Sequence, residues 1–161
     1  MGAGKTEVGR ELSRLTGFTL IDADEEIIKA EGMPITEIFK QKGEPYFRDL
    51  ETRAIKEISK KKNLIISTGG GAVLRKENMD ALREGGIIVC LMASPETILK
   101  RTGNDDTRPL LQVPDPLGMI KELLAERMPY YRQADMTMDT GGKTPKEIAE
   151  EILKKAKAWK P

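Results

Sequence analysis

Apolar residues along the chain recur in two patterns, short continuous runs and longer stretches with helical spacing. The continuous runs are bounded by polar or turn-forming residues and predict strands. They fall at 18–21, 64–67, 86–93 and 136–138. The stretches with helical spacing predict helices. They fall at 7–15, 25–31, 36–42, 45–60, 76–83, 94–101, 115–127 and from 145 onward. Strands that alternate with helices indicate an α/β fold built on a parallel sheet.

Composition then narrows the classes of function. Lys and Arg total 27 against 26 Asp and Glu, so the net charge of +1 does not favour nucleic acid as a partner. The absence of histidine excludes Ser-His-Asp and Cys-His catalysis and histidine-ligated zinc. Cys90 is the only cysteine and lies in an apolar run, so we expect a packed thiol and no disulfide. We find no apolar run long enough to span a membrane and no secretory signal pattern, and we therefore expect a cytoplasmic protein without a membrane partner.

The first residues match the back half of a phosphate-binding loop, G-x-x-x-x-G-K-[ST]. Backbone N–H groups of Gly2, Ala3 and Gly4 can wrap an anion, and the helix that follows adds its partial positive charge. Lys5 supplies a full charge to the β- and γ-phosphates, and Thr6 offers its hydroxyl to Mg²⁺. The first glycine of the motif and the apolar strand that normally precedes it would fall before Met1. We therefore expect an incomplete loop and a sheet that lacks its first strand.

Two carboxylates follow the first predicted strand. Asp22 and Asp24 alternate in an extended segment and can face one cleft. One can help to hold Mg²⁺ through water, and the other can accept a proton from a substrate hydroxyl. The alternative is that both cap the next helix, which a lone D-x-D would favour. Because a phosphate-binding loop stands in the same chain, we favour the site.

A triple glycine and an arginine are further candidates for binding a substrate. Gly69, Gly70 and Gly71 follow a buried strand directly, where bare backbone N–H groups can approach a ligand, although three glycines are also a flexible turn. Arg48 can clamp an anionic substrate, and its alternative is a surface ion pair with Glu51.

Two later arginines are candidates as well. Arg108 lies in a predicted mobile loop and can reach phosphates when that loop closes, or it is simply exposed. Arg127 follows the inward face of its helix, so it needs a ligand or an acidic partner such as Glu122 or Glu126.

Six motifs in this order resemble shikimate kinase, a family of the P-loop kinase superfamily. The resemblance runs from residue 1 to about residue 152. The motifs are G-A-G-K-T at 2–6, D-A-D at 22–24, G-E-P-Y-F-R at 43–48, S-T-G-G-G at 67–71, R-P-L-L at 108–111 and E-R-M-P-Y-Y at 126–131. It implies a three-layer αβα fold with a central parallel sheet, here without its first strand. A single domain, 1–161, would carry a substrate-binding helical segment at about 24–55 and a mobile lid at about 103–116.

The resemblance also implies an activity, the transfer of phosphate from ATP to the 3-hydroxyl of shikimate in chorismate and aromatic amino acid biosynthesis. Mg²⁺ would be held with the help of Thr6 and Asp22. The other roles are implied in the same way. ATP would contact Gly2, Ala3, Gly4, Lys5, Thr6, Arg101, Arg108 and Lys143, shikimate would contact Asp24, Arg48, Gly69, Gly70, Gly71 and Arg127, and catalysis would rest on Lys5, Asp24 as general base and Arg108. Glu51 would line or brace the substrate side.

Three alternatives stay open from the sequence. One is another small-molecule kinase of the superfamily, such as a gluconate kinase. A second is a non-catalytic remnant that binds nucleotide or shikimate, because the phosphate-binding loop is incomplete. A third is a module of a larger multi-enzyme polypeptide. A monomer is the expectation that the resemblance carries.

Overall fold

A computed structural model describes residues 2–102, 111 and 113–159. Helices and short parallel strands alternate along these residues, as the hydrophobic pattern predicts. The helices are α1 (Lys5–Thr16), α2 (Ala23–Glu31), α3 (Ile35–Ser59), α4 (Lys76–Gly85), α5 (Pro95–Thr102), α6 (Pro116–Tyr131) and α7 (Pro145–Ala158), with one 3₁₀ turn, η1 (Ala72–Leu74). The strands are β1 (Thr19–Asp22), β2 (Leu64–Ser67), β3 (Val89–Met92) and β4 (Met136–Asp139).

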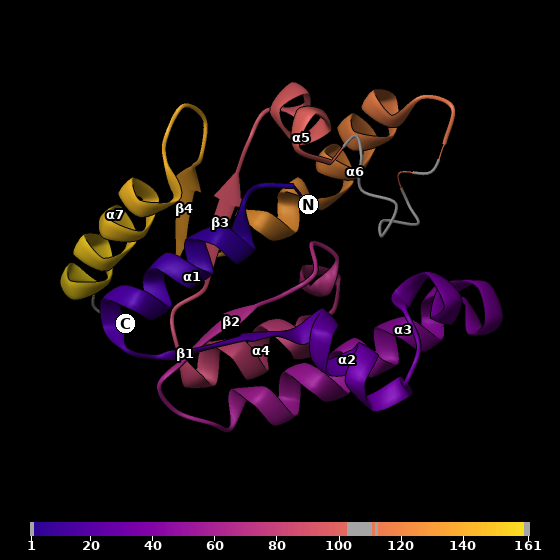
Figure 1. The fold of residues 1–161 in the computed structure, drawn as a ribbon, viewed down its shortest axis with the longest axis horizontal. Helices are drawn as coiled ribbons and strands as arrows, with labels where there is room; N and C mark the ends of the chain where they lie inside the picture. The colour runs from indigo at the N-terminus through magenta and orange to yellow at the C-terminus, as the bar shows by residue number, and fades with distance from the viewer. Residues whose placement is uncertain (1, 103–110, 112, 160–161) are drawn as a thin grey trace.

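The described strands form two parallel pairs rather than one continuous sheet. Strand β1 pairs with β2, with Asp22 opposite Ser67, and β3 pairs with β4, with Met92 opposite Asp139. Among the described residues β2 and β3 are not hydrogen-bonded to each other. Figure 1 shows the two pairs on either side of α1. This arrangement agrees with the expected α/β fold with parallel strands.

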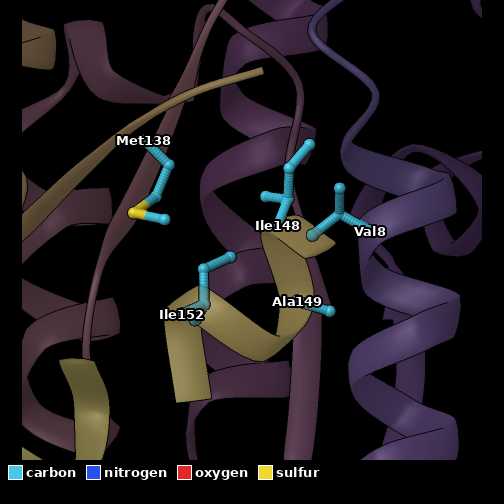
Figure 2. Close-up of a cluster of buried hydrophobic side chains, with 5 residues drawn as sticks. All are labelled: Val8, Met138, Ile148, Ala149 and Ile152. Carbon is cyan, nitrogen blue, oxygen red and sulfur yellow. The ribbon is translucent and has the colours of Figure 1, made fainter. Parts of the chain in front are cut away.

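Helix α1 packs against both strand pairs. Its Val8 is 2% exposed and lies in a cluster with Met138 of β4 and residues of α7 (Figure 2). On another face of α1, a Cβ added to Gly9 would come within 2.8 Å of the side chain of Leu20 in β1. The same helix therefore covers both pairs and holds them in one fold.

An apolar cavity of about 80 Å³ lies next to β3. Its walls come from β3, from the inward face of α4 through Met79 and Leu82, and from the end of α6. Lys5 and the residues after β2, Thr68 to Gly70, line it as well. The residues of β3 are only half-buried, which is unusual for a parallel strand because such strands are normally covered on both sides.

Local signals account for most helix ends. Gly17 ends α1 in the left-handed conformation, and Thr144 opens α7 with a complete capping box, as the sequence predicts. The two predicted helices 36–42 and 45–60 are one assigned helix, α3, interrupted at Gly43, whose φ of 79° is non-helical. Helix α6 continues past its predicted end at Arg127 as far as Tyr131.

One strand is shorter than predicted, and no described helix could span a membrane. The predicted strand 86–93 is shorter in the structure, because only Val89–Met92 is in parallel register with β4. In the described part of the chain, we find no helix with the length and apolar character needed to cross a membrane.

Candidate active site

The phosphate-binding loop is shaped by two glycines with positive φ. Gly2 has a φ of 57° and Gly4 a φ of 84°, a region that side-chain-bearing residues rarely adopt. At Gly2 the space is also closed, because a Cβ there would lie 2.9 Å from Cγ2 of Thr102. Gly4 is the N-cap of α1, and Lys5 is the first helical residue. The turn thus presents backbone N–H groups of a helix N-terminus, which can bind an anion.

Arg101 lies against this loop. Its Nη1 donates to the carbonyl oxygen of Gly2 at 3.4 Å and to Oγ1 of Thr140 at 3.2 Å. Lys143 is held differently, because its ammonium forms an ion pair with Glu151 at 2.7 Å. Of these two candidates for contacting ATP, only Arg101 has a described hydrogen bond to the loop.

The two aspartates at the end of β1 have different surroundings. Asp22 is the N-cap of α2, and its Oδ1 accepts a hydrogen bond from the backbone N–H of Asp24 at 3.0 Å. The capping alternative is therefore realised for Asp22. Asp24 turns toward the glycine loop instead, since a Cβ on Gly69 would lie 3.3 Å from its Oδ1. The register of β1 and β2, which end side by side, brings Asp24 and Gly69 together.

Arg48 and Glu51 form a buried ion pair. Nη1 of Arg48 lies 2.8 Å from Oε2 of Glu51, whose side chain is fully buried, and Nη2 lies 2.8 Å from Oε1 of Glu44. The predicted pair of Arg48 with Glu51 exists, but it lies inside the protein and not on its surface. An interior pair is costly to desolvate and sensitive to the loss of either partner.

Burial sets the ionisation of this pair. Desolvation raises the pKa of Glu51, and the nearby charge of Asp24 raises it further, while Arg48 and Arg127 oppose the shift. Desolvation works against the charged form of Arg48 too, but its two glutamates outweigh it and raise the pKa of the guanidinium. Arg48 therefore stays charged, whereas the surroundings of Glu51 disfavour its charged form.

Arg127 is buried without an acidic partner on its own helix. It is 5% exposed, and its Nε has no hydrogen-bond partner among the described residues. Glu122 and Glu126 are exposed and form no described ion pair with it. An inward arginine with an unsatisfied nitrogen is suited to an anionic ligand, because a ligand carboxylate would satisfy it.

The triple-glycine loop lies directly against these charged side chains. A Cβ on Gly69 would come within 2.8 Å of Oε1 of Glu51, and one on Gly71 within 2.5 Å of Nη2 of Arg48. Any side chain at either position would displace a buried charge. The loop needs glycine here because the charged groups approach its backbone so closely.

Most predicted site residues thus meet at one edge of the fold. The substrate candidates Asp24, Arg48 and the triple glycine are in contact, and Lys5 shares the cavity wall with Gly69 and Gly70. Arg108 and the predicted lid up to residue 110 lie outside the described residues. A lysine beside a phosphate-binding loop, together with arginines and one aspartate near the glycine loop, is a set of groups that can serve phosphoryl transfer to a small acid.

A family model described as shikimate kinase matches residues 1–157. The chain belongs to the shikimate kinase family. Shikimate kinase of Thermodesulfovibrio yellowstonii is 52% identical over 154 residues, which are 96% of this chain and 89% of that protein. Shikimate kinase of Caldanaerobacter subterraneus is 47% identical over 154 residues, 96% of this chain and 90% of that protein. Both the predicted family and its enzyme class, a phosphotransferase, are confirmed.

Solved structures agree with the family. Shikimate kinase from Acinetobacter baumannii, in complex with shikimate, superposes with a TM-score of 0.95 at 40% identity, covering 98% of this chain and 89% of that chain. A sugar kinase from Janibacter sp. has a TM-score of 0.52 at 20% identity, covering 95% of this chain and 87% of that chain, and shares the fold alone. The predicted P-loop kinase fold is confirmed.

Two side chains that hold the glycine loop of this shikimate kinase family member were not predicted from the sequence. The hydroxyl of Tyr131 donates to the carbonyl oxygen of Gly70 at 2.8 Å, and Nδ2 of the fully buried Asn78 donates to the carbonyl oxygen of Ala72 at 2.9 Å. Tyr131 stands in the E-R-M-P-Y-Y motif, which was the available signal. Asn78 stands in an ordinary helix, and the sequence carries no signal for it.

Proposed function

We propose that this protein transfers the γ-phosphoryl group of ATP to the 3-hydroxyl of shikimate. The observation that carries the proposal is the contact of the glycine loop with Asp24 on one side and with Arg48 on the other. The contact brings a carboxylate and a guanidinium to one short loop, and these groups would suit the hydroxyls and the carboxylate of a small hydroxy acid. The relatives' names supply the substrate, and the described residues supply matching chemistry.

The substrate carboxylate would be bound by Arg48 and Arg127. Arg48 is already oriented by Glu51 and Glu44, and Arg127 has a buried nitrogen to satisfy. Planar guanidinium groups bind a carboxylate through two parallel hydrogen bonds, which fixes its direction as well as its place. With the carboxylate held there, Asp24 would contact the ring hydroxyls and act as general base for the 3-hydroxyl. The bare backbone of Gly69, Gly70 and Gly71 would close the pocket.

ATP would bind with its phosphates on Gly2, Ala3, Gly4, Lys5 and Thr6. Lys5 would stabilise charge on the transferring phosphoryl group, which is the main requirement of this chemistry. Arg101, hydrogen-bonded to the loop, would border the nucleotide on the other side, with Lys143 farther along. The predicted catalytic role of Arg108 stays a prediction.

Mg²⁺ fits the donor chemistry at this site. Thr6 offers an exposed hydroxyl, and Asp22 uses only its Oδ1 for capping, so its second oxygen is open for a metal-bound water. Hydroxyl, carboxylate and water oxygens are the ligands that Mg²⁺ takes beside substrate phosphates. When bound, the ion would neutralise charge on the β- and γ-phosphates. Removal of divalent ions with EDTA should abolish turnover, and added Mg²⁺ should restore it.

The decisive experiment measures ADP release and shikimate 3-phosphate formation by the purified chain with Mg-ATP, with and without shikimate. Shikimate-dependent formation of both products is expected, and Asp24→Asn is expected to abolish it. A folded chain that binds shikimate without forming product would instead support the non-catalytic remnant. A set of candidate substrates that includes gluconate tests the alternative of another small-molecule kinase. Phosphorylation of shikimate alone would exclude that alternative.

The resemblance also supports a monomeric, cytoplasmic enzyme whose partners are ATP and shikimate alone. Sedimentation at several protein concentrations tests the first part. A mass that stays at that of one chain is expected, and a concentration-dependent dimer would contradict it.

A further inference from the structure

The triple-glycine loop is attached to two helices at neighbouring carbonyl groups. The hydroxyl of Tyr131, at the end of α6, donates to Gly70, and the amide of Asn78, in α4, donates to Ala72. The described backbone bonds around these points are those of a 3₁₀ turn, such as Ala72 N–H to the carbonyl of Gly69 at 3.2 Å. Glycine-rich backbone has many accessible conformations. The two side-chain bonds therefore restrict the conformations that are open to the loop.

Tyr131 has a second connection, because it lies one helical turn after Arg127 on the same face of α6. Burial raises the pKa of the Tyr131 hydroxyl, against the opposing charge of Arg127 and a hydrogen bond to it. The phenol therefore remains a donor across the working range of pH. Its bond to Gly70 spans 61 positions of the sequence and joins the helix that carries Arg127 to the loop that contacts Arg48.

We propose that Tyr131 is a positioning residue that fixes the glycine loop to the helix of Arg127, so that the two arginines keep the spacing a carboxylate requires. The proposal rests on the proposed function, because it assigns this hydrogen bond to the binding of shikimate. Tyr131 acts through Gly70 and Arg127. Without its hydroxyl the loop and helix would move independently, and the carboxylate would be bound by two arginines whose spacing varies.

Tyr131→Phe removes the hydroxyl and keeps the ring. The neighbouring Tyr130→Phe is a matched control, because Tyr130 is 39% exposed and its hydroxyl forms no described hydrogen bond. We expect Tyr131→Phe to raise the KM for shikimate about 3- to 10-fold, the value of one hydrogen bond, with kcat and the KM for ATP within about 2-fold of the parent. Equal rises in both KM values, or a KM for shikimate like that of Tyr130→Phe, would overturn the proposal.

A double variant tests whether the effect passes through Arg127. In the Arg127→Ala background the further change Tyr131→Phe should raise the KM for shikimate by less than about 2-fold, because nothing is left for the loop to align with. A full additive rise would overturn the proposal.

Hydrogen–deuterium exchange separates this proposal from the proposed function. Amides of residues 68–74 should exchange faster in Tyr131→Phe than in Tyr130→Phe, whether or not the chain turns over shikimate. Unchanged exchange overturns the positioning role. A parent chain that lacks shikimate-dependent turnover overturns the proposed function. The exchange comparison would still decide whether Tyr131 positions the loop.

Discussion

The two ends of the site are built in different ways. At the phosphate end, the described contacts are mostly backbone: positive-φ glycines, a helix N-terminus and an arginine bound to the Gly2 carbonyl. At the proposed shikimate end, charged side chains are buried and paired with one another, with Glu51 fully buried beside Arg48. The first end follows from local backbone geometry. The second end depends on a network that several distant segments complete.

This difference has an energetic consequence. Interior charges make the fold depend on each partner, because a charge left alone in the interior is far more costly than one left alone in water. A backbone anion site has no such dependence. Substitutions at the phosphate end should therefore change chemistry and leave folding intact, whereas those at the shikimate end should change both.

The largest difference between an effect on catalysis and an effect on stability is expected for Lys5→Met. Loss of the charge that stabilises the transferring phosphoryl group should lower kcat by about 10³-fold or more. The midpoint of urea unfolding should change little, because Lys5 belongs to none of the buried hydrophobic clusters. Lys62→Met, at an exposed lysine, is the control. A kcat within 10-fold of the parent would contradict the comparison at its phosphate end.

At the shikimate end, Arg48→Met should lower the free energy of unfolding by about 3 kcal/mol at pH 8. Glu51 would then be a buried carboxylate without its paired cation. Burial and Asp24 raise its pKa, and of the two arginines that oppose them only Arg127 would remain. Since a raised pKa disfavours the ionised carboxyl, the loss of stability should be smaller at pH 5 than at pH 8, because protonation of Glu51 is easier at the lower pH.

The matched control for this prediction is Arg53→Met, an exposed arginine on the same helix, which should cost less than about 0.5 kcal/mol. Urea unfolding of both variants at the two pH values decides the matter. An Arg48→Met variant whose loss does not depend on pH would show that Glu51 is not the group left uncompensated.

Arg127→Ala should raise the KM for shikimate about 10- to 100-fold, the range for hydrogen bonds to a charged group, with the KM for ATP unchanged. Arg132→Ala, an exposed arginine just after the same helix, should leave both constants near the parent values. Steady-state kinetics with each substrate varied in turn gives the result. A normal KM for shikimate would remove Arg127 from the site.

The smallest expected effect concerns Glu51 in the unchanged network. Its raised pKa means that the folded state holds the proton more tightly than the unfolded state. The associated stability is present below the ordinary glutamate pKa and is lost as pH rises through the raised value. Glu51→Gln should flatten this part of the stability–pH curve. The comparison runs from pH 4.5, the ordinary pKa of glutamate, to about pH 7. Equal slopes for parent and variant in this range would show that Arg48 fully offsets the effect of burial on Glu51.

Sequence patterns predicted elements and local motifs well where the cause is local. The strand 64–67 and the capping box at Thr144 have the predicted positions, because apolar runs and capping residues act within a few positions. The predicted strand 86–93 was too long, since an apolar run does not mark where a partner strand begins to pair. Likewise the sequence placed Arg48 and Glu51 one turn apart, but only the fold shows that glycines about twenty positions later bury them.

The contacts that the sequence could not predict are the nonlocal ones. The bond between Tyr131 and Gly70 joins segments 61 positions apart, and nothing in either segment marks the other. Asp22 shows that a local pattern can also be ambiguous. The same residues fit a helix cap and a metal ligand, and the structure shows the cap.

Helix α1 connects the phosphate-binding loop to both strand pairs. The helix starts in the phosphate-binding loop and packs on both strand pairs, through Val8 toward β4 and through Gly9 toward β1. A phosphate bound at its N-terminus would therefore stabilise a helix that contacts both strand pairs. ATP bound in that position would stabilise the fold as well as react. At 100 times its dissociation constant it would add about 2.7 kcal/mol to the free energy of unfolding.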